Sequence, residues 1–178
     1  MAAPKTVLIT GATRGIGLTL AEHYVRLGWK VIGAVRDPAA ADKLDSSDEA
    51  SILNAAKALE GEAIDLLINN AGILLSSGTL AATTKDDLLK QFEVNSVGPF
   101  LVTRAFIPHL KAAVAKHGSA YVAQISSVMG SIGLNFGGYY GYRESKAAVN
   151  MINSSLAIDL KMTRSALSCC TLAGCKRT

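Results

Sequence analysis

Cysteine is missing from most of this 178-residue sequence. Its three cysteines, Cys169, Cys170 and Cys175, all lie close to the carboxyl end. Three thiols cannot form a closed disulfide framework, which agrees with a reducing compartment. The start of the sequence has no apolar run behind a basic region, so no signal peptide is visible. No stretch approaches the roughly 20 apolar residues that span a bilayer. These absences favour a cytoplasmic protein that makes no membrane contact.

Strong charge is missing as well. The 18 lysines and arginines and 14 aspartates and glutamates give a formal net charge of +4, and the basic residues are scattered. This pattern indicates solubility and argues against a nucleic-acid partner. A composition that is 49% hydrophobic, with 16 glycines, is ordinary for one α/β domain that is long enough to bury a core.

Buried-strand patterns and amphipathic-helix patterns alternate along the chain. Strands are expected at residues 6–10, 30–35, 64–68 and 120–125. Helices are expected at residues 16–27, 48–59, 85–116 and 142–160. The third helix should be broken near Gly98-Pro99 and strained at Pro108. The alternation predicts an α/β fold with a Rossmann-like, doubly wound parallel sheet.

One strand is missing from that scheme. A doubly wound sheet normally has a third strand, followed by a helix, after the second strand. Residues 36–63 look helical or polar throughout, and Leu44 alone does not make a strand. We therefore expect no third strand.

A glycine-rich segment, TGATRGIG, joins the first predicted strand to the first predicted helix. Its glycines, Gly11, Gly15 and Gly17, permit a tight turn whose backbone N–H groups can approach a ligand closely. The amino-terminal end of the helix adds partial positive charge, so a pyrophosphate fits there. The alternative is a glycine-rich turn that binds nothing.

Two arginines bear on which dinucleotide would bind. Arg14 lies inside the turn, and Arg36 follows the second strand, near the expected position of an adenosine ribose. Arginine can bind a 2′-phosphate through forked, charge-assisted hydrogen bonds, which favours NADP over NAD. Asp37 beside Arg36 argues the other way, and either arginine could be a solvated surface charge.

Polar side chains also follow two later strands and interrupt a helical run. NNAG, at residues 69–72, lies at the carboxyl edge of the sheet, where α/β proteins bind ligands, although a plain Asn-Gly turn would also explain it. Ser126 and Ser127 close another strand at this edge, where a hydroxyl could hold a substrate oxygen. Asn95, in FEVNSVG, is a polar residue inside a helical run, and a kink or a helix cap would also explain it.

Tyr142 and Lys146, in GYRESK, lie four residues apart and therefore share one face of a helix. An ammonium group near a phenol favours the phenolate, which makes tyrosine a usable general acid or base near neutral pH. Most pairs with this spacing are surface neighbours, so the pair alone indicates little.

The segments TGATRGIG, NNAG, FEVNSVG, QISS and YRESK, in this order, resemble the short-chain dehydrogenase/reductase family over about residues 5–162. The long serine-to-tyrosine segment SSVMGSIGLNFGGYYGYR is similar to that of the C-factor and sniffer-type carbonyl reductases. The resemblance implies an oxidoreductase that transfers hydride between NADP(H), or NAD(H), and a small-molecule carbonyl or secondary alcohol.

The resemblance also implies residue roles. Tyr142 would pass a proton to the substrate oxygen, while Lys146 would bind the nicotinamide ribose and support the phenolate. Ser127, or as a weaker alternative Ser126, would hydrogen-bond the carbonyl, and Asn95 would hold a water that links Lys146 to solvent. The resemblance implies a larger set of residues around the cofactor: Gly11, Arg14, Gly15, Ile16, Gly17, Arg36, Asp45, Asn70, Ala71 and Gly72. No metal is expected. The helices near residues 97–115 and 142–160 commonly form the dimer interface in the family, so a homodimer is an open expectation.

The tail, residues 165–178, departs from the family pattern. Relatives have a further strand and a Pro-Gly loop that closes over the nicotinamide, whereas this chain has SALSCCTLAGCKRT. Grouped from the third base, suitable codons for residues 170–178 spell His-Pro-Gly-Trp-Val-Gln-Thr-Asp, which resembles the family's loop. We infer a frameshift, a splicing error or a gene-model error shortly before Ser165. A genuinely divergent tail is the alternative, and a cysteine-based zinc site would lack a fourth ligand.

The two departures together predict an incomplete fold. Residues 1–164 would form a Rossmann-like domain and residues 165–178 an out-of-family tail. The sheet would have about four strands, in the order 2-1-4-5 if the missing strand keeps the number three, with both edges exposed. The enzyme reading therefore has two rivals: a truncated isoform that binds a dinucleotide or a partner without turnover, and a chain that hardly folds.

Overall fold

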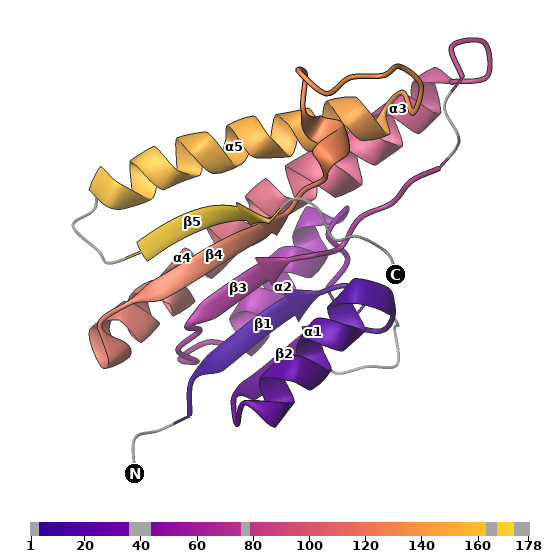
Figure 1. Cartoon of the computed structure of the whole chain (residues 1–178). Coiled ribbons are helices and arrows are strands. Elements are labelled where there is room, and N and C mark those ends of the chain that lie inside the picture. Colours follow the sequence, from indigo (N-terminus) through magenta and orange to yellow (C-terminus); the bar gives the residue numbers. More distant parts are fainter. Residues whose placement is uncertain (1–3, 36–43, 76–78, 163–166, 173–178) are drawn as a thin grey trace.

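The computed structural model describes residues 4–35, 44–75, 79–162 and 167–172. Figure 1 shows one twisted sheet with α1 in front of it, α2 and α4 behind it, and α5 along its β5 side. The strands of the described residues are β1 Thr6–Thr10, β2 Lys30–Ala34, β3 Leu66–Asn69, β4 Ala120–Ile125 and β5 Leu167–Leu172. They are all parallel and lie in the order β2-β1-β3-β4-β5.

The helices follow the strands in the alternating pattern that the sequence predicts. Their bounds are α1 Gly15–Arg26, α2 Glu49–Ala58, α3 Lys85–Phe92, the π-helical turn η1 Glu93–Val97, α4 Gly98–His117, the 3₁₀ turn η2 Val128–Gly130 and α5 Tyr142–Met162. A capping box starts α3, because the Thr84 hydroxyl accepts the Asp87 N–H and the Asp87 carboxylate accepts from Thr84. Gly118, at a φ of 84°, ends α4 in the left-handed conformation.

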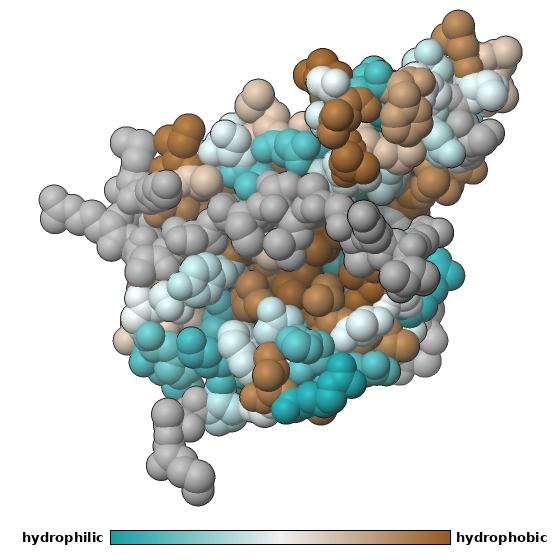
Figure 2. All heavy atoms as spheres, viewed as in Figure 1, coloured by the Kyte–Doolittle hydropathy of each residue, from teal (hydrophilic) through white to brown (hydrophobic). Residues whose placement is uncertain are grey.

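The sheet buries side chains on both faces, but the two faces differ. The face toward α2, α4 and α5, called here the three-helix face, includes Leu8, Leu67 and Phe106 in a large apolar cluster. The opposite face, called here the α1 face, has a smaller cluster around Val7 and Ile9. Successive residues of a strand point to opposite faces, so β1 contributes to both clusters. Figure 2 shows hydrophobic atoms of the sheet still visible between α1 and the grey atoms.

The Rossmann-like prediction is confirmed, but the prediction that the sheet ends at residues 120–125 is wrong. The four expected strands lie in the expected order, and β5 pairs beside them along the whole length of β4, from Ala120 with Leu167 to Ile125 with Leu172. The free edge of β4 offers a full row of backbone N–H and C=O groups, and α5 returns the chain to that edge. The segment LSCCTL can therefore be a strand despite its unusual composition. The predicted domain boundary after residue 164 stays a prediction.

No strand lies between β2 and β3 among the described residues there, 35 and 44–65. The N–H of Leu44 donates to the carbonyl of Val35 at 2.9 Å, so the described chain resumes directly beside the end of β2. Residues 36–43 lie outside the described residues.

The third predicted helix is interrupted earlier than expected. Gly98 begins α4 rather than breaking the run, and the irregular turn is η1, directly before it. A Cβ at Gly98 would lie 2.3 Å from the carbonyl oxygen of Ser46, so this glycine serves a close contact with the segment before α2. Pro108 is accommodated inside α4.

Candidate active site

The glycine-rich turn connects β1 to α1 at the carboxyl edge of the sheet. Gly11 has a φ of 67°, and its N–H donates to the carbonyl of Ala34 at the end of β2, at 3.0 Å. A Cβ at Gly17 would lie 2.2 Å from the Gly11 carbonyl oxygen and 2.5 Å from Nδ2 of Asn70. The third glycine therefore lets α1 start against its own turn.

Asn70 ties this turn to the end of β3. Its Nδ2 donates to the carbonyl oxygens of Thr10 and Gly11, at 3.0 and 3.1 Å. The Thr10 hydroxyl in turn accepts the N–H groups of Asn70 and Ala71, both at 3.0 Å. Four hydrogen bonds thus fix the NNAG segment against the turn. Sequence reasoning missed Thr10, although its position as the last residue before the glycine turn was a signal.

The two asparagines of NNAG have different partners. The amide of Asn69 points into the core, where it donates to the Pro99 carbonyl at 3.3 Å and to the Thr103 hydroxyl at 3.0 Å. Asn69 therefore anchors β3 to α4, and Asn70 alone faces the turn.

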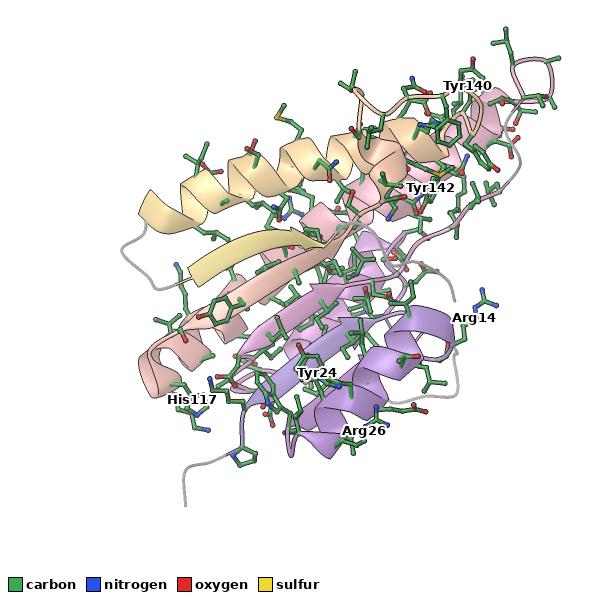
Figure 3. The ribbon with its side chains drawn as sticks, viewed as in Figure 1. Arg14, Tyr24, Arg26, His117, Tyr140 and Tyr142 are labelled. Atoms are coloured by element: carbon green, nitrogen blue, oxygen red, sulfur yellow. The ribbon has the colours of Figure 1, made fainter. Side chains whose placement is uncertain are left out.

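The other predicted cofactor residues are more exposed. Arg14, Gly15 and Ile16 are exposed where α1 begins, and no acidic residue lies in the first turn of that helix. Figure 3 shows Arg14 extending outward at the carboxyl edge of the sheet. Asp45 accepts hydrogen bonds from the N–H and hydroxyl of Ser47, at 2.9 and 2.8 Å. Arg36 lies outside the described residues.

Asn95 lies fully buried in the π-helical turn η1. Its Oδ1 accepts the N–H of Ile73 at 2.8 Å and its Nδ2 donates to the carbonyl of Ile73 at 2.9 Å. The same Nδ2 reaches the Ser145 hydroxyl at 3.0 Å, and that hydroxyl donates to the carbonyl of Tyr142 at 2.7 Å. Isolated π-helical turns are frequent at functional sites, and this one joins the segment after β3 to the first turn of α5.

Lys146 is buried beneath the same edge. Its Nζ donates to the carbonyl of Ile125 at 2.8 Å and lies 5.7 Å from the ring centre of Tyr142. Burial lowers the pKa of Lys146 from 10.5 to about 8. A Cβ at Gly72 would lie 3.2 Å from Oδ1 of Asn95 and 3.7 Å from Nζ of Lys146, so the glycine keeps the space in front of both groups open.

The two candidate serines are placed differently. Ser127 is half-buried, and its hydroxyl oxygen accepts the N–H of Met129 at 3.1 Å; its O–H donates to no partner among the described residues. Ser126 is buried, and its hydroxyl approaches the carbonyl of Lys146 at 3.4 Å. Figure 3 shows Tyr142 at the start of α5, beyond the carboxyl ends of the strands. Of the two serines, Ser127 is therefore the more accessible to a ligand.

A family model described as short chain dehydrogenase matches residues 5–178. The chain belongs to the short-chain dehydrogenase family. The fungal short chain dehydrogenase gsfK of Penicillium aethiopicum is 33% identical over 180 residues, which cover 89% of this chain and 71% of that protein. C-signal of Myxococcus xanthus is 39% identical over 99 residues, covering 55% of this chain and 57% of that protein.

Solved structures agree with this placement. Carbonyl reductase Sniffer of D. melanogaster superposes with a TM-score of 0.87 at 28% identity, over 96% of this chain and 80% of that one. The NADPH-bound carbonyl reductase from chicken fatty liver gives 0.82 at 31% identity, over 96% and 78%. The resemblance to the short-chain dehydrogenases and to sniffer-type carbonyl reductases is confirmed. This short-chain dehydrogenase spans less than two thirds of the length of several curated relatives, 57% for C-signal among them.

Two features are absent from the described residues of this short-chain dehydrogenase. Over those residues, no helix is long and apolar enough to cross a membrane. Within the same part of the chain, no three or more histidine, cysteine, aspartate or glutamate side chains group in a way that could hold a metal ion.

Proposed function

We propose that this short-chain dehydrogenase is an NADP(H)-dependent carbonyl reductase, transferring hydride between the nicotinamide and a carbonyl or secondary alcohol. The observation that carries the proposal is one arrangement at the carboxyl edge of the sheet. A buried Lys146 lies 5.7 Å from the ring of Tyr142, beside Asn95 and the segment that holds the glycine turn.

The residues around the turn fit a dinucleotide. The backbone at Gly17 approaches Gly11 too closely for any side chain, and a Cβ at Gly72 would fill the space before Asn95 and Lys146. The start of α1 would hold the pyrophosphate through its free N–H groups. Ala71 and Asn70 would line the adenosine side. When bound, the cofactor supplies the hydride.

The chain's own groups handle the proton and the substrate oxygen. Tyr142 would donate its hydroxyl proton to the oxygen of the carbonyl being reduced. Ser127, whose O–H donates to no partner among the described residues, would donate to the same oxygen. The Lys146 ammonium would stabilise the phenolate that forms at Tyr142.

Asn95 would support this arrangement from the side. Its amide binds both backbone groups of Ile73 and the Ser145 hydroxyl. It therefore fixes the segment after β3 relative to Ser145, the residue directly before Lys146. That it also holds a water between Lys146 and solvent stays part of the proposal.

NADP is preferred over NAD on two grounds. Arg14 is exposed at the edge where a 2′-phosphate would lie, and Arg36 follows β2 in the sequence. Among similar proteins, a carbonyl reductase is named as NADPH-bound, and a Haemophilus influenzae relative that is 30% identical is named a probable NADP-dependent dehydrogenase. Arginine suits the 2′-phosphate because its forked donors match phosphate oxygens.

The substrate would be apolar and enter beside the connection from β4 to α5. That connection exposes large apolar side chains, among them Ile132 at 87% and Phe136 at 72%. Figure 2 shows hydrophobic atoms gathered on this part of the surface, at the top of the view. Apolar ketones and quinones are therefore the first substrates to test.

The decisive experiment follows NADPH oxidation by the full chain over a panel of such compounds, with Tyr142→Phe as the matched control. We expect wild-type turnover and a loss of at least about 100-fold in Tyr142→Phe, since positioned general acid catalysis contributes about 10²–10⁴-fold. Folded protein that binds NADPH without turnover would refute the reductase and leave a dinucleotide-binding module. Equal turnover by both proteins would refute the role of Tyr142.

A further inference from the structure

Gln91 is the residue of α3 that is wholly buried. Its exposed fraction is 0%, whereas the apolar neighbours Leu89 and Phe92 are 58% and 43% exposed. A helix that turns a polar amide inward and its large apolar side chains outward reverses the usual amphipathic pattern. Burying an amide is costly unless it is hydrogen-bonded, so the partners of Gln91 explain its position.

The Gln91 amide joins three segments that are distant in sequence. Its Oε1 accepts the N–H of Leu75, in the segment that follows NNAG, at 3.3 Å. Its Nε2 donates to the carbonyl of Asp87 within α3 at 3.2 Å and to the carbonyl of Tyr140 at 3.3 Å. Tyr140 lies in the turn directly before α5, two residues from Tyr142.

That turn is strained. Tyr139 has a φ of 55°, which costs a side-chain-bearing residue free energy and persists only where surrounding contacts fix it. Gly141 follows at a φ of 84°, and a Cβ there would lie 2.4 Å from Nε2 of Gln91. The turn is therefore packed directly against the Gln91 amide, without room for a side chain between them.

The turn also sets the start of α5. The N–H of Gly141 donates to the Glu144 carboxylate at 2.6 Å, and the carbonyl of Gly141 accepts the N–H of Ser145 at 3.1 Å. Ser145 is held in turn by Asn95. Gln91 and Asn95 lie four residues apart. Gln91 thus binds the turn before α5 through Tyr140, and Asn95 binds the first turn of α5 through Ser145.

We propose that Gln91 is a positioning residue that fixes Tyr142 for proton transfer, acting through the Tyr140 carbonyl and Gly141. Without the amide, the strained turn can relax and carry the tyrosine hydroxyl away from its working position near Lys146. The role in catalysis rests on the proposed reductase function, while the positioning itself is a property of the fold.

The test is Gln91→Met, which keeps the length and volume of the side chain and removes its hydrogen bonds. Gln124→Met is the matched control, because Gln124 is also 0% exposed and donates to Thr103 at 3.3 Å, in the core. Gln91→Asn is a second variant, since it keeps a buried amide that is one methylene too short to reach Tyr140.

We expect both Gln91 variants to bind NADPH within about twofold of wild type, to keep the substrate KM within about threefold, and to lose about 10- to 100-fold in kcat. Small misplacements of a reacting group have effects of this size. Gln124→Met should leave kcat unchanged. If the Gln91 variants melt earlier but keep the wild-type kcat, or lose no more kcat than Gln124→Met, Gln91 is only structural and the proposal is overturned.

A second readout does not need turnover. Fluorotyrosine incorporated into the chain gives a fluorine NMR signal for Tyr142, assigned by its absence in Tyr142→Phe. The signal should shift or broaden in Gln91→Met and stay unchanged in Gln124→Met. An unchanged Tyr142 signal in Gln91→Met would overturn the proposal even if the reductase function holds. A changed signal in a chain without turnover would support it while the reductase function fails.

Discussion

The two faces of the sheet are packed very differently. Among the described residues, the cluster on the three-helix face contains sixteen buried apolar residues, from Leu8 to Leu160, and the cluster on the α1 face contains five. The α1 face relies instead on partly buried side chains such as Tyr24 and Trp29, whose ring centres lie 5.1 Å apart. The larger cluster therefore accounts for most of the hydrophobic stabilisation.

The proposed functional groups also divide between the two faces. Lys146 lies on α5, which packs on the three-helix face, and Asn95 lies in η1, directly before α4 of that face; both side chains are buried. The glycine turn opens α1, the helix that covers the opposite face. The comparison teaches that the proposed proton-transfer groups are built on the more heavily packed side of the molecule, while the proposed cofactor cradle is built on the less heavily packed side.

The largest expected effect comes from two neighbouring residues of β1 that point to opposite faces. Leu8 is 1% exposed toward the three-helix face, and Ile9 is 0% exposed toward the α1 face. Leu8→Ala should cost about 3–5 kcal/mol in the free energy of unfolding, and Ile9→Ala about 2–3 kcal/mol, because large-to-small substitutions cost more where the surroundings cannot collapse. Urea unfolding at neutral pH measures both.

The test is whether Leu8→Ala loses more free energy of unfolding than Ile9→Ala. Equal losses, or a larger loss for Ile9→Ala, would show that the α1 face is as tightly packed as the other. The difference between the faces would then have no energetic meaning.

A second prediction concerns the free energy that it costs to bury the charge of Lys146, on the more heavily packed side. The pKa of Lys146 is about 8 in the folded chain against 10.5 for a free lysine, because burial disfavours the charged form. Below pH 8 both states carry the proton and the fold bears the cost of a buried charge. Between pH 8 and 10.5 the unfolded state binds more protons, so wild-type stability should rise with pH by up to about 3 kcal/mol.

Lys146→Met removes that charge. It should abolish turnover yet raise the free energy of unfolding by about 2 kcal/mol at pH 7, with an advantage that shrinks toward pH 10.5. Urea unfolding of both proteins at the two pH values checks this. A variant that is destabilised at pH 7 would mean that the bond from Lys146 to Ile125 outweighs the burial of the charge.

Sequence patterns were reliable where one local rule decides the structure. The buried run 6–10 became β1, and the spacing of Tyr142 and Lys146 put both on one helix beside the sheet edge. Gln91 was missed, although an amide between Leu89 and Phe92, two apolar residues that face outward, was a visible signal. Its partners at Leu75 and Tyr140 are long-range, and no local pattern specifies them.

The carboxyl-terminal strand was missed for a different reason. Residues 167–172 lie outside the segments whose motifs carry the resemblance, and pairing with the open edge of β4 is a tertiary event that composition does not reveal. The frameshift, splicing error or gene-model error shortly before Ser165 stays a prediction. Coding DNA that spells no Pro-Gly-Trp in the shifted frame would contradict it.

The smallest expected effect separates two glycines at the start of α1. A Cβ at Gly17 would lie 2.2 Å from the Gly11 carbonyl oxygen, whereas a Cβ at Gly15 meets nothing within 4 Å, although Gly15 has a φ of 55°. Gly17→Ala should lower the free energy of unfolding by about 2 kcal/mol through overpacking, and Gly15→Ala by about 1 kcal/mol through backbone strain.

If the α1 face is loosely packed, α1 can shift to relieve the clash at Gly17. We therefore expect Gly17→Ala to weaken NADPH binding at least about 10-fold, measured by fluorescence titration, while Tyr142 keeps its wild-type fluorine NMR signal. Gly17→Ala that unfolds the chain, or that also moves the Tyr142 signal, would show that the cradle and the proton-transfer groups form one rigid unit.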